Sequence, residues 1–449
     1  MKILLINPPR SPENSVKKYA PDDAKDFVFK LIGPPLGLLT VAGAVINDYE
    51  VKLLETKAEY DLNPNGPPLE VLVNKYLEDF DPDIVGVTFI ASEFNDGIKI
   101  FKTVKKYNPE ILTVAGGLHA TLCPYDFKDK SVDIVCKGQA ANIFRKIVET
   151  HEKKGNFEKI GGILINTDKG LVPTEAPIER WDPAVKNYIM PERSLIKKWL
   201  NAYKVSTHQF RATYLFTSLG CPYNCSFCSI WPQFNGEYYQ REIESIIKEL
   251  NTLVDYEVVR FADANTIIDH TFVNRLFTRI IEEKINKDFV MDIRFDTIVK
   301  YPKLIEKLAK AGLKVVICGF ESYKDEELKK YKKGSNANLI EDAINILHQN
   351  EIMIRGNYVV PNYYDEDDFK ALAQYALDHN VVFPGYTILT PMPGTVFYEQ
   401  MKDQIIDFNL SKYNLLNCVL KTKLPIEKFY ENVGKLWLIK KGDEIINVK

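Results

Sequence analysis

Three cysteines within eight positions constrain this 449-residue chain more than any other feature. They are Cys221, Cys225 and Cys228 in the stretch "GCPYNCSFC", and the next cysteine along the chain is Cys318. Proline and asparagine, which form turns, stand between them, and the stretch follows the apolar, β-prone run "ATYLFTS". The spacing therefore predicts a loop after a strand, able to wrap a compact object.

An iron–sulfur cluster explains three such thiols better than zinc does. A structural zinc site is normally closed by four protein ligands, and the sequence places no fourth ligand nearby. A [4Fe-4S] cluster held by three thiolates keeps one iron open to a small molecule. Ordinary reduced cysteines are the plainer alternative. The other cysteines lack this spacing, and Cys318, in the apolar run "VVICGF", is expected to be a small buried side chain.

Composition and charge narrow the class of protein. Hydrophobic residues make up 45% of the chain and charged residues 27%, as in ordinary globular proteins, and the net charge of −3 offers no general attraction to nucleic acid or anionic membranes. No apolar run approaches the roughly 18 residues of a membrane span, and the opening "MKILLINPPR" lacks a signal-peptide pattern. Seven cysteines, with three of them clustered, fit a reducing compartment. We expect a cytoplasmic protein.

The first 155 residues alternate between apolar β-type runs and helical patterns. Runs such as "KILLIN", "DIVGVTFI" and "ILTVAGG" are separated by stretches such as "FNDGIKIFKTVKKY". This alternation predicts an α/β, doubly wound, Rossmann-like domain built on a parallel sheet. Ligands of such sheets bind at the carboxyl ends of the strands. The residues expected there are small and polar: Asn7, Ser92, Gly116, Gly117 and Thr121.

The rest of the chain divides into three further parts. Residues 156–208 are expected to be a linker that contains a short hairpin at "GGILINTDKG". From 209 to 400 the alternation resumes with six β-type runs, among them "EVVRFAD", "LKVVICG" and "EIMIRGNYVV", which fit a partial (β/α)₆ barrel. Residues 401–449 are expected to form a helical C-terminal region.

The spacing C-x₃-C-x-aromatic-C, with Phe227 as the aromatic residue, resembles the signature of the radical S-adenosylmethionine (SAM) enzymes. The N-terminal runs "PPLGLLTVAGAV", "GVTF" and "GGLHAT" resemble the cobalamin-binding domain that precedes the barrel in one large class of these enzymes. Each motif stands in the order that this class has. The resemblance implies three cofactors: a [4Fe-4S] cluster on the three cysteines, SAM and cobalamin.

The resemblance also implies cobalamin contacts at the strand ends of the first domain. This chain lacks D-x-H-x-x-G, the segment by which many cobalamin proteins supply a histidine to cobalt, and His119 is expected to be a hydrogen-bonded loop residue. The family usually follows the next loop glycine with an acidic residue, whereas here Gly138 is followed by Gln139. The implied cobalamin contacts are Asn7, Ser92, Gly116, Gly117, Thr121 and Gly138.

Barrel active sites gather at the C-terminal ends of the strands, and this rule selects the candidate SAM contacts. Arg294 is expected to grip the SAM carboxylate through two hydrogen bonds, or to pair with Asp292 or Asp296. Asp263 is expected near the SAM amino group, or as a cap of the following turn, and Glu321 alternatively as a solvated loop carboxylate. The full expected set is Asp263, Asn265, Arg294, Glu321, Ser322, Gly356 and Gly394.

By this resemblance the chain is expected to be a methyltransferase. A 5′-deoxyadenosyl radical would take hydrogen from a small-molecule substrate, and methylcobalamin would methylate its carbon or phosphorus, with electrons from a donor such as flavodoxin or ferredoxin. Cyclisation, ring contraction or oxidation without methyl transfer is the alternative, and a non-catalytic module that binds SAM and cobalamin is a third reading. A tRNA-modifying enzyme is less favoured, because the sequence shows no basic face for RNA.

Overall fold

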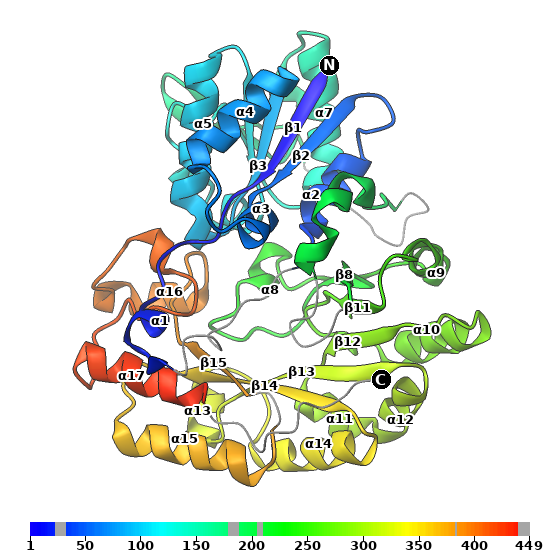
Figure 1. The fold of residues 1–449 in the computed structure, drawn as a ribbon, viewed down its shortest axis with the longest axis vertical. Coiled ribbons are helices and arrows are strands. Elements are labelled where there is room, and N and C mark those ends of the chain that lie inside the picture. The colour runs from blue at the N-terminus through cyan, green and yellow to red at the C-terminus, as the bar shows by residue number, and fades with distance from the viewer. Residues whose placement is uncertain (23–32, 178–187, 204–209, 382–383, 439–449) are drawn as a thin grey trace. The chain divides into compact units, whose positions relative to one another are not determined.

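The computed structural model describes residues 1–22, 33–177, 188–203, 210–381 and 384–438. These residues form two compact units (Figure 1). Unit 1 comprises Met1–Pro12 and Ile32–Tyr203, and unit 2 comprises Glu13–Leu31 and Lys204–Lys449. Among the described residues, no helix is long and apolar enough to cross a membrane.

Unit 1 is built on a seven-stranded sheet with the order β2-β1-β3-β4-β5-β6-β7. Neighbouring strands from β2 to β5 pair in parallel, whereas β6 and β7 are antiparallel. The strand order reverses between β1 and β3, the kind of switch point at which doubly wound sheets bind ligands. The strands are β1 (Lys2–Asn7), β2 (Glu50–Glu55), β3 (Ile84–Thr88), β4 (Leu112–Gly116), β5 (Ile134–Cys136), β6 (Ile163–Thr167) and β7 (Gly170–Pro173).

Helices pack against both faces of this sheet, which confirms the predicted doubly wound fold. Alternate residues of β1 point to opposite faces, so Ile3 and Leu5 enter one apolar core while Leu4 and Ile6 enter the other. The first core includes residues of α2 and α7, and the second includes residues of α4 and α5. The helices of unit 1 are α2 (Leu36–Gly43), α3 (Thr56–Leu62), α4 (Leu69–Phe80), α5 (Phe94–Tyr107), α6 (Leu118–Leu122) and α7 (Ala140–Glu152).

The segment expected to be a linker, 156–208, belongs largely to unit 1. The predicted hairpin is present as β6 and β7, but β6 also hydrogen-bonds to β5 and so extends the sheet. The 3₁₀ segment η5 (Arg193–Tyr203) contributes Ile196, Trp199 and Tyr203 to the first apolar core. Because these side chains are buried in the core of unit 1, the segment is part of that unit and not a free linker between domains. Residues 178–187 and 204–209 lie outside the described residues.

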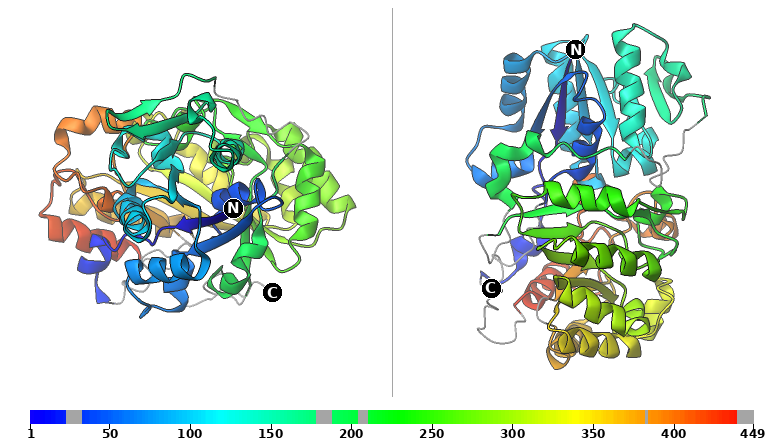
Figure 2. Two further views of the ribbon diagram at one scale, coloured as in Figure 1. Left: turned by 90° about the horizontal axis from the view of Figure 1, so that it is seen from above. Right: turned by 90° about the vertical axis from the view of Figure 1, so that its right-hand side faces the viewer.

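Unit 2 contains the predicted six-stranded partial barrel, whose sheet is seen from two further sides in Figure 2. All its strands are parallel, and their order is β15-β14-β13-β12-β11-β8. A short antiparallel pair, β9 (Ser218–Gly220) and β10 (Tyr238–Gln240), follows β8. The barrel strands are β8 (Ala212–Leu215), β11 (Val258–Phe261), β12 (Asp288–Asp292), β13 (Leu313–Glu321), β14 (Met353–Val360) and β15 (Gly385–Ile388). The helices between them are α8 (Ile230–Gln233), α9 (Ile243–Thr252), α10 (His270–Glu282), α11 (Phe295–Lys300), α12 (Pro302–Lys310), α13 (Asp325–Lys330), α14 (Asn338–Gln349) and α15 (Glu366–Asp378).

The region after the barrel is less helical than expected. It contains α16 (Val396–Met401), two 3₁₀ turns and α17 (Ile426–Leu436), and residues 439–449 lie outside the described residues. An N-terminal helix, α1 (Ser15–Tyr19), packs on α17, with the rings of Tyr19 and Tyr430 stacked 5.7 Å apart. Residues 13–22 therefore belong to unit 2, although the sequence pattern assigned them to the first domain.

A buried ion pair fixes the start of α9 against the barrel. Arg241 Nη1 lies 2.7 Å from Glu249 Oε2 with both side chains fully buried, and Arg241 also donates to the carbonyl of Phe216. Removing one member of such a pair leaves an uncompensated buried charge, which costs about 3–5 kcal/mol. We therefore expect Glu249→Ala to lower the free energy of unfolding by about this amount in urea denaturation.

Glu244→Ala on the same helix is the matched control. Glu244 pairs with Arg279 at the surface, where its side chain is 68% exposed, and exposed pairs contribute about 1 kcal/mol or less. Equal losses of stability in the two variants would contradict the assignment.

Candidate active site

The cysteine loop begins at a backbone conformation that requires glycine. Gly220 ends β9 with φ of +80°, a left-handed value, and a Cβ atom there would lie 2.0 Å from the carbonyl oxygen of Glu237. Gly220 pairs with Tyr238 of β10. The close approach of these two short strands therefore sets the direction in which the chain enters Cys221.

Hydrogen bonds to distant segments of unit 2 hold the loop in place. Ser226 donates its backbone N–H to the carbonyl of Tyr331 at 3.1 Å and accepts one from the N–H of Phe397 at 2.9 Å. Trp231 Nε1 donates to the carbonyl of Cys225 at 2.9 Å. The ring of Phe227, the aromatic residue of the motif, packs edge-on against Tyr331 at 5.7 Å. The loop is thus ordered by the protein itself.

The three thiols of the loop are free cysteines in a largely buried setting. Cys221 and Cys225 are each 9% exposed, and burial raises the pKa of the Cys221 and Cys228 thiols. Cys228 Sγ accepts a hydrogen bond from the N–H of Ile230 at 3.4 Å. Buried thiolates need a positive partner, and a metal ion deprotonates the thiols that bind it. Three free thiols on one ordered loop fit a cluster with one open iron.

Two buried cations lie close enough to the loop to act on its sulfurs. The positive charges of Arg294 and Lys333 both lower the pKa of Cys221, against the larger effect of burial. Lys333 forms an ion pair with Glu321 at 2.8 Å, and both side chains are almost buried. Sequence reasoning missed Lys333, because in "KKYKKG" one lysine looks like its neighbours and only the fold turns this one inward.

Asp263 and Asn265, the two residues expected at the end of β11, are both buried but differ in their contacts. The Asp263 carboxylate accepts hydrogen bonds from the N–H and hydroxyl of Thr217, both at 2.7 Å, and from the N–H of Ser218 at 2.9 Å. Burial raises its pKa to about 6, although these bonds oppose the shift. Asn265 Nδ2 has no hydrogen-bond partner among the described residues, so it is available to a ligand.

Arg294 pairs with Asp296, one of the two carboxylates that the sequence suggested as alternative partners. Its guanidinium makes two hydrogen bonds to Asp296, at 2.7 and 3.0 Å, donates to the carbonyl of Lys333 and lies 4.0 Å above the ring of Tyr223. A guanidinium that is already held by a carboxylate has less to offer a second one. Its expected role as the partner of the SAM carboxylate stays a prediction.

The remaining expected SAM contacts differ in position. Glu321 ends β13 in a left-handed conformation, with φ of +63°. Ser322 donates its hydroxyl to Glu327 at 2.6 Å and is buried. Gly394 lies in the turn after β15, where it was expected. The prediction for Gly356 is wrong in its placement, because β14 continues to Val360 and a Cβ atom on Gly356 would meet the ring of Phe320 at 2.6 Å. This glycine therefore serves side-chain packing.

A cavity lies inside the partial barrel and reaches the C-terminal ends of its strands. Phe227 of the cysteine motif and Glu321 line it, together with apolar residues of β14, β15 and the C-terminal region. The polar and aromatic residues that sequence reasoning did not select are Arg260, Arg355, Asn357, Thr387, Thr390, Asn414 and Trp437. The available signal was alternation, since Arg355 and Asn357 stand two apart in an otherwise apolar strand.

Two arginines, Arg260 and Arg355, line this cavity. Arg260 holds Asp292 through contacts of 2.8 and 3.2 Å. Burial, and next the charge of Arg260, lower the pKa of Arg355 to about 10. A guanidinium with this pKa remains charged at neutral pH. The cavity therefore holds a charged guanidinium beside the ion pair of Arg260 and Asp292.

The expected cobalamin contacts lie at the carboxyl edge of the sheet in unit 1. Space is open where a Cβ atom would stand on Gly116 or on Gly138, so a ligand can approach the backbone at both glycines. The hydroxyl of Thr121 accepts a hydrogen bond from the N–H of Gly138 at 3.0 Å, which joins two of the expected residues. Gly117, with φ of +94°, packs against Phe89 instead. This edge therefore has room for a ligand at two of the expected glycines.

Two further expected residues of this edge, Asn7 and Ser92, are buried. Asn7 Nδ2 donates to Glu55 Oε2 at 2.7 Å, so the amide is engaged within the protein. His119, which we expected to be a hydrogen-bonded loop residue, is buried with Nε2 2.9 Å from Asp126 Oδ2. Its partner is a carboxylate, but the geometry of the contact is not that of a hydrogen bond.

Comparison with protein families yields two matches. Residues 215–376 match the model of the radical SAM superfamily, and residues 27–148 match the model of the B12-binding domain. The first range includes the cysteine loop and most of the barrel strands, and the second includes β2 to β5 of unit 1.

Several curated proteins are similar to this chain. An uncharacterized methyltransferase of Pyrococcus horikoshii is 27% identical over 94% of this chain and 88% of its own length. The hopanoid C-3 methylase of Methylococcus capsulatus is 24% identical, with 89% and 75% covered. The anaerobic magnesium-protoporphyrin IX monomethyl ester cyclase of Rubrivivax gelatinosus is 26% identical, with 78% and 64% covered.

Among solved structures, the radical S-adenosylmethionine methyltransferase TsrM from Kitasatospora setae has the same fold, with a TM-score of 0.70 at 17% identity. The alignment covers 96% of this chain and 84% of TsrM, whose structure contains cobalamin and a [4Fe-4S] cluster. A second structure, that of the cobalamin-dependent enzyme OxsB, gives a TM-score of 0.69 at 13% identity, with 97% and 65% covered.

The buried carboxyl of Glu55, which holds Asn7, predicts a pH dependence of stability. Burial raises its pKa from 4.5 to about 7. A carboxyl whose pKa is higher in the folded state binds its proton more tightly there, so its stabilisation is complete below pH 4.5 and is lost as the pH rises through 7. We expect Glu55→Gln to remove about 2–3 kcal/mol of the stability lost between pH 5 and pH 8. Urea unfolding at the two pH values measures this difference.

Glu50→Gln, at the exposed start of the same strand, is the control and should keep the wild-type dependence. Retention of that dependence in Glu55→Gln would show that another group causes it.

Proposed function

This chain is a cobalamin-binding radical SAM protein, and on that premise we propose that it is a methyltransferase for an unactivated carbon or phosphorus of a small molecule. The observation that carries the proposal is the pairing, in one chain, of an ordered three-cysteine loop with a glycine-lined ligand edge. Similarity to two proteins named as methyl-transferring enzymes supports methyl transfer over other outcomes.

The residues of unit 2 divide the work of holding the cluster and SAM. Cys221, Cys225 and Cys228 would bind the cluster, and the contacts of Ser226 and Trp231 keep the three sulfurs on one ordered loop. The carboxylate of Asp263 accepts hydrogen bonds from Thr217 and Ser218 and so fixes the segment just before the loop. When bound, the cluster and SAM supply a carbon radical, and cobalamin carries the methyl group.

The cavity of the barrel is the place where these residues would bind SAM. Phe227 and Glu321 line it, and Thr387 and Asn357 add hydrogen-bonding groups from neighbouring strands. Asn265, with an unpartnered amide, and the turn at Gly394 are further contacts in this proposal. The apolar part of the lining excludes water, which protects a radical from side reactions.

The edge of unit 1 would bind cobalamin through backbone as much as through side chains. Gly116 and Gly138 leave room for a ligand against the chain, and Thr121 fixes the second of these loops. Of the two buried polar residues at this edge, Ser92 remains a proposed contact, and Asn7 would act by supporting the edge through Glu55.

A second candidate function is radical chemistry without net methyl transfer. The specific observation in its favour is the similarity to the anaerobic magnesium-protoporphyrin IX monomethyl ester cyclase. In both functions the same residues would bind the same cofactors. They differ in whether the methyl group of SAM appears in the product.

We further propose a reducing, cytoplasmic location and an external one-electron donor such as flavodoxin or ferredoxin. The support is the chain's seven cysteines, none of which forms a disulfide in the described structure, since a buried cluster of this class needs both reduced thiols and a source of electrons.

Anaerobic reconstitution with iron, sulfide and hydroxocobalamin tests the proposal. The wild-type chain should show the absorption of an iron–sulfur cluster, retain cobalamin and, when reduced, convert SAM to 5′-deoxyadenosine. Cys225→Ala removes a cluster ligand, so cluster absorption and SAM cleavage should fall at least 100-fold while cobalamin stays bound.

Cys418→Ala is the matched control, because Cys418 is similarly buried but lies outside the cysteine loop, where its thiol donates to the carbonyl of Leu420. Equal SAM cleavage by Cys225→Ala and wild type would refute the cluster assignment. With labelled SAM, a labelled product supports methyl transfer, and an unlabelled altered product supports the second function.

A further inference from the structure

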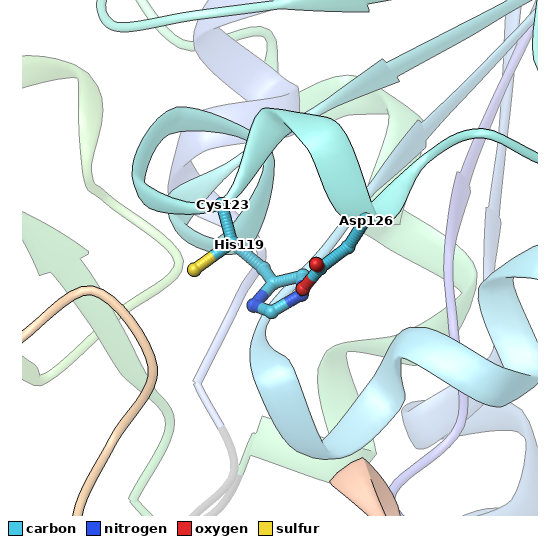
Figure 3. Close-up of side chains that lie close together, drawn as sticks. All are labelled: His119, Cys123 and Asp126. Atoms are coloured by element: carbon cyan, nitrogen blue, oxygen red, sulfur yellow. The ribbon is translucent and has the colours of Figure 1, made fainter. Parts of the chain in front are cut away.

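A second group of metal-binding side chains lies in unit 1, apart from the cysteine loop. The segment "HATLCPYD" supplies His119 from α6, Cys123 from the residue that ends this helix, and Asp126 from the following 3₁₀ turn, η3 (Pro124–Asp126). One ligand atom of each, a nitrogen, a sulfur and an oxygen, lies within 4.8 Å of the other two (Figure 3). Three different donors therefore lie near one another within one short segment.

The imidazole of His119 is fixed and its Nε2 is unsatisfied. The side chain is 2% exposed, and its ring is packed against Phe94 at 5.2 Å and Phe127 at 5.8 Å. Nε2 lies 2.9 Å from Asp126 Oδ2, yet it makes no hydrogen bond to any described residue. A buried polar nitrogen without a hydrogen bond costs about 1–3 kcal/mol, so it calls for a ligand.

We propose that His119, Cys123 and Asp126 bind a divalent transition-metal ion of the zinc class. Imidazole, thiolate and carboxylate are the three kinds of ligand that Zn²⁺ takes in proteins. The thiolate and carboxylate charges balance the charge of the ion. Calcium and magnesium are disfavoured, because both prefer sets of oxygen ligands. Three protein ligands leave one position of a tetrahedral ion for water or another small ligand.

The three donor atoms must move to bind one ion, because each lies within 4.8 Å of the other two and a tetrahedral zinc site places its ligand atoms about 3.4–3.6 Å apart. With metal–ligand distances of about 2.0–2.2 Å and tetrahedral angles, the His119 nitrogen and the Asp126 oxygen would stand about 3.4 Å apart. The present separation is 2.9 Å. Asp126 and Cys123 are the ligands that can move, because the Asp126 side chain is 46% exposed and Cys123 is only partly buried, while the ring of His119 is held by its aromatic neighbours.

The ion would stabilise the end of α6 without being part of the radical chemistry. The helix has five residues, and a metal that joins its first turn to η3 would hold both. Thr121, on the same helix, carries the hydrogen bond from Gly138. The proposal does not depend on the proposed function.

The test is a zinc titration of the full chain with its cluster reconstituted and without cobalamin, in competition with a chromophoric chelator. We expect the wild type to bind one equivalent of Zn²⁺. Asp126→Asn, at an exposed position that leaves the fold intact, should weaken this binding at least tenfold. His119→Gln and Cys123→Ser should abolish it, with thermal unfolding followed by circular dichroism to show that each variant is folded.

Co²⁺ provides a spectroscopic check of the ligands. It should give a thiolate-to-metal charge-transfer band that Cys123→Ser removes and Cys136→Ser keeps. Asp129→Asn, in the next loop turn, is the control for loss of a nearby carboxylate and should bind as the wild type does. Absence of the first equivalent in wild type, or its persistence in Cys123→Ser, would overturn the proposal. Zinc on the cysteine loop would appear as a separate equivalent that depends on Cys225.

Discussion

The carboxylate of Asp263 joins two neighbouring barrel strands at the point where the cysteine loop begins. It accepts three hydrogen bonds from Thr217 and Ser218, and the carbonyl of Thr217 in turn accepts one from the N–H of Arg241. Gly220 then turns the chain into the loop. Because these contacts are buried, the strand cannot shift without breaking several bonds at once. The position of the three sulfurs follows from this junction.

The sequence predicted the parts of the fold that depend on periodicity. Alternating β-type and helical runs predicted a parallel doubly wound sheet and six barrel strands, and both are present. It could not predict that β6 joins the first sheet or that Trp199 enters its core. A short hairpin or a connector has the same sequence pattern whether it packs against a domain or only links two domains. Boundaries set by tertiary contacts leave no local pattern.

The same division applies to the site. The cysteines can be recognised in the sequence because the cluster that they bind requires this spacing. The partner of Arg294 depends on the fold instead, because Asp292 and Asp296 are equally near in sequence and only Asp296 pairs with it. Gly356 was misplaced because it stands inside the run "EIMIRGNYVV" and not at the C-terminal end of the strand, which continues to Val360. Lys333 went unnoticed, since burial and not composition distinguishes it.

The packing of α1 on α17 has a consequence for how the chain is made. About 400 residues are synthesised between α1 and α17, so the surface of α1 that packs on α17 has no α17 to contact while unit 1 is being made. Unit 1 is also discontinuous in sequence, because Glu13–Leu31, between its two parts, belongs to unit 2. The helix α1 therefore reaches its packed position only after α17 has been synthesised.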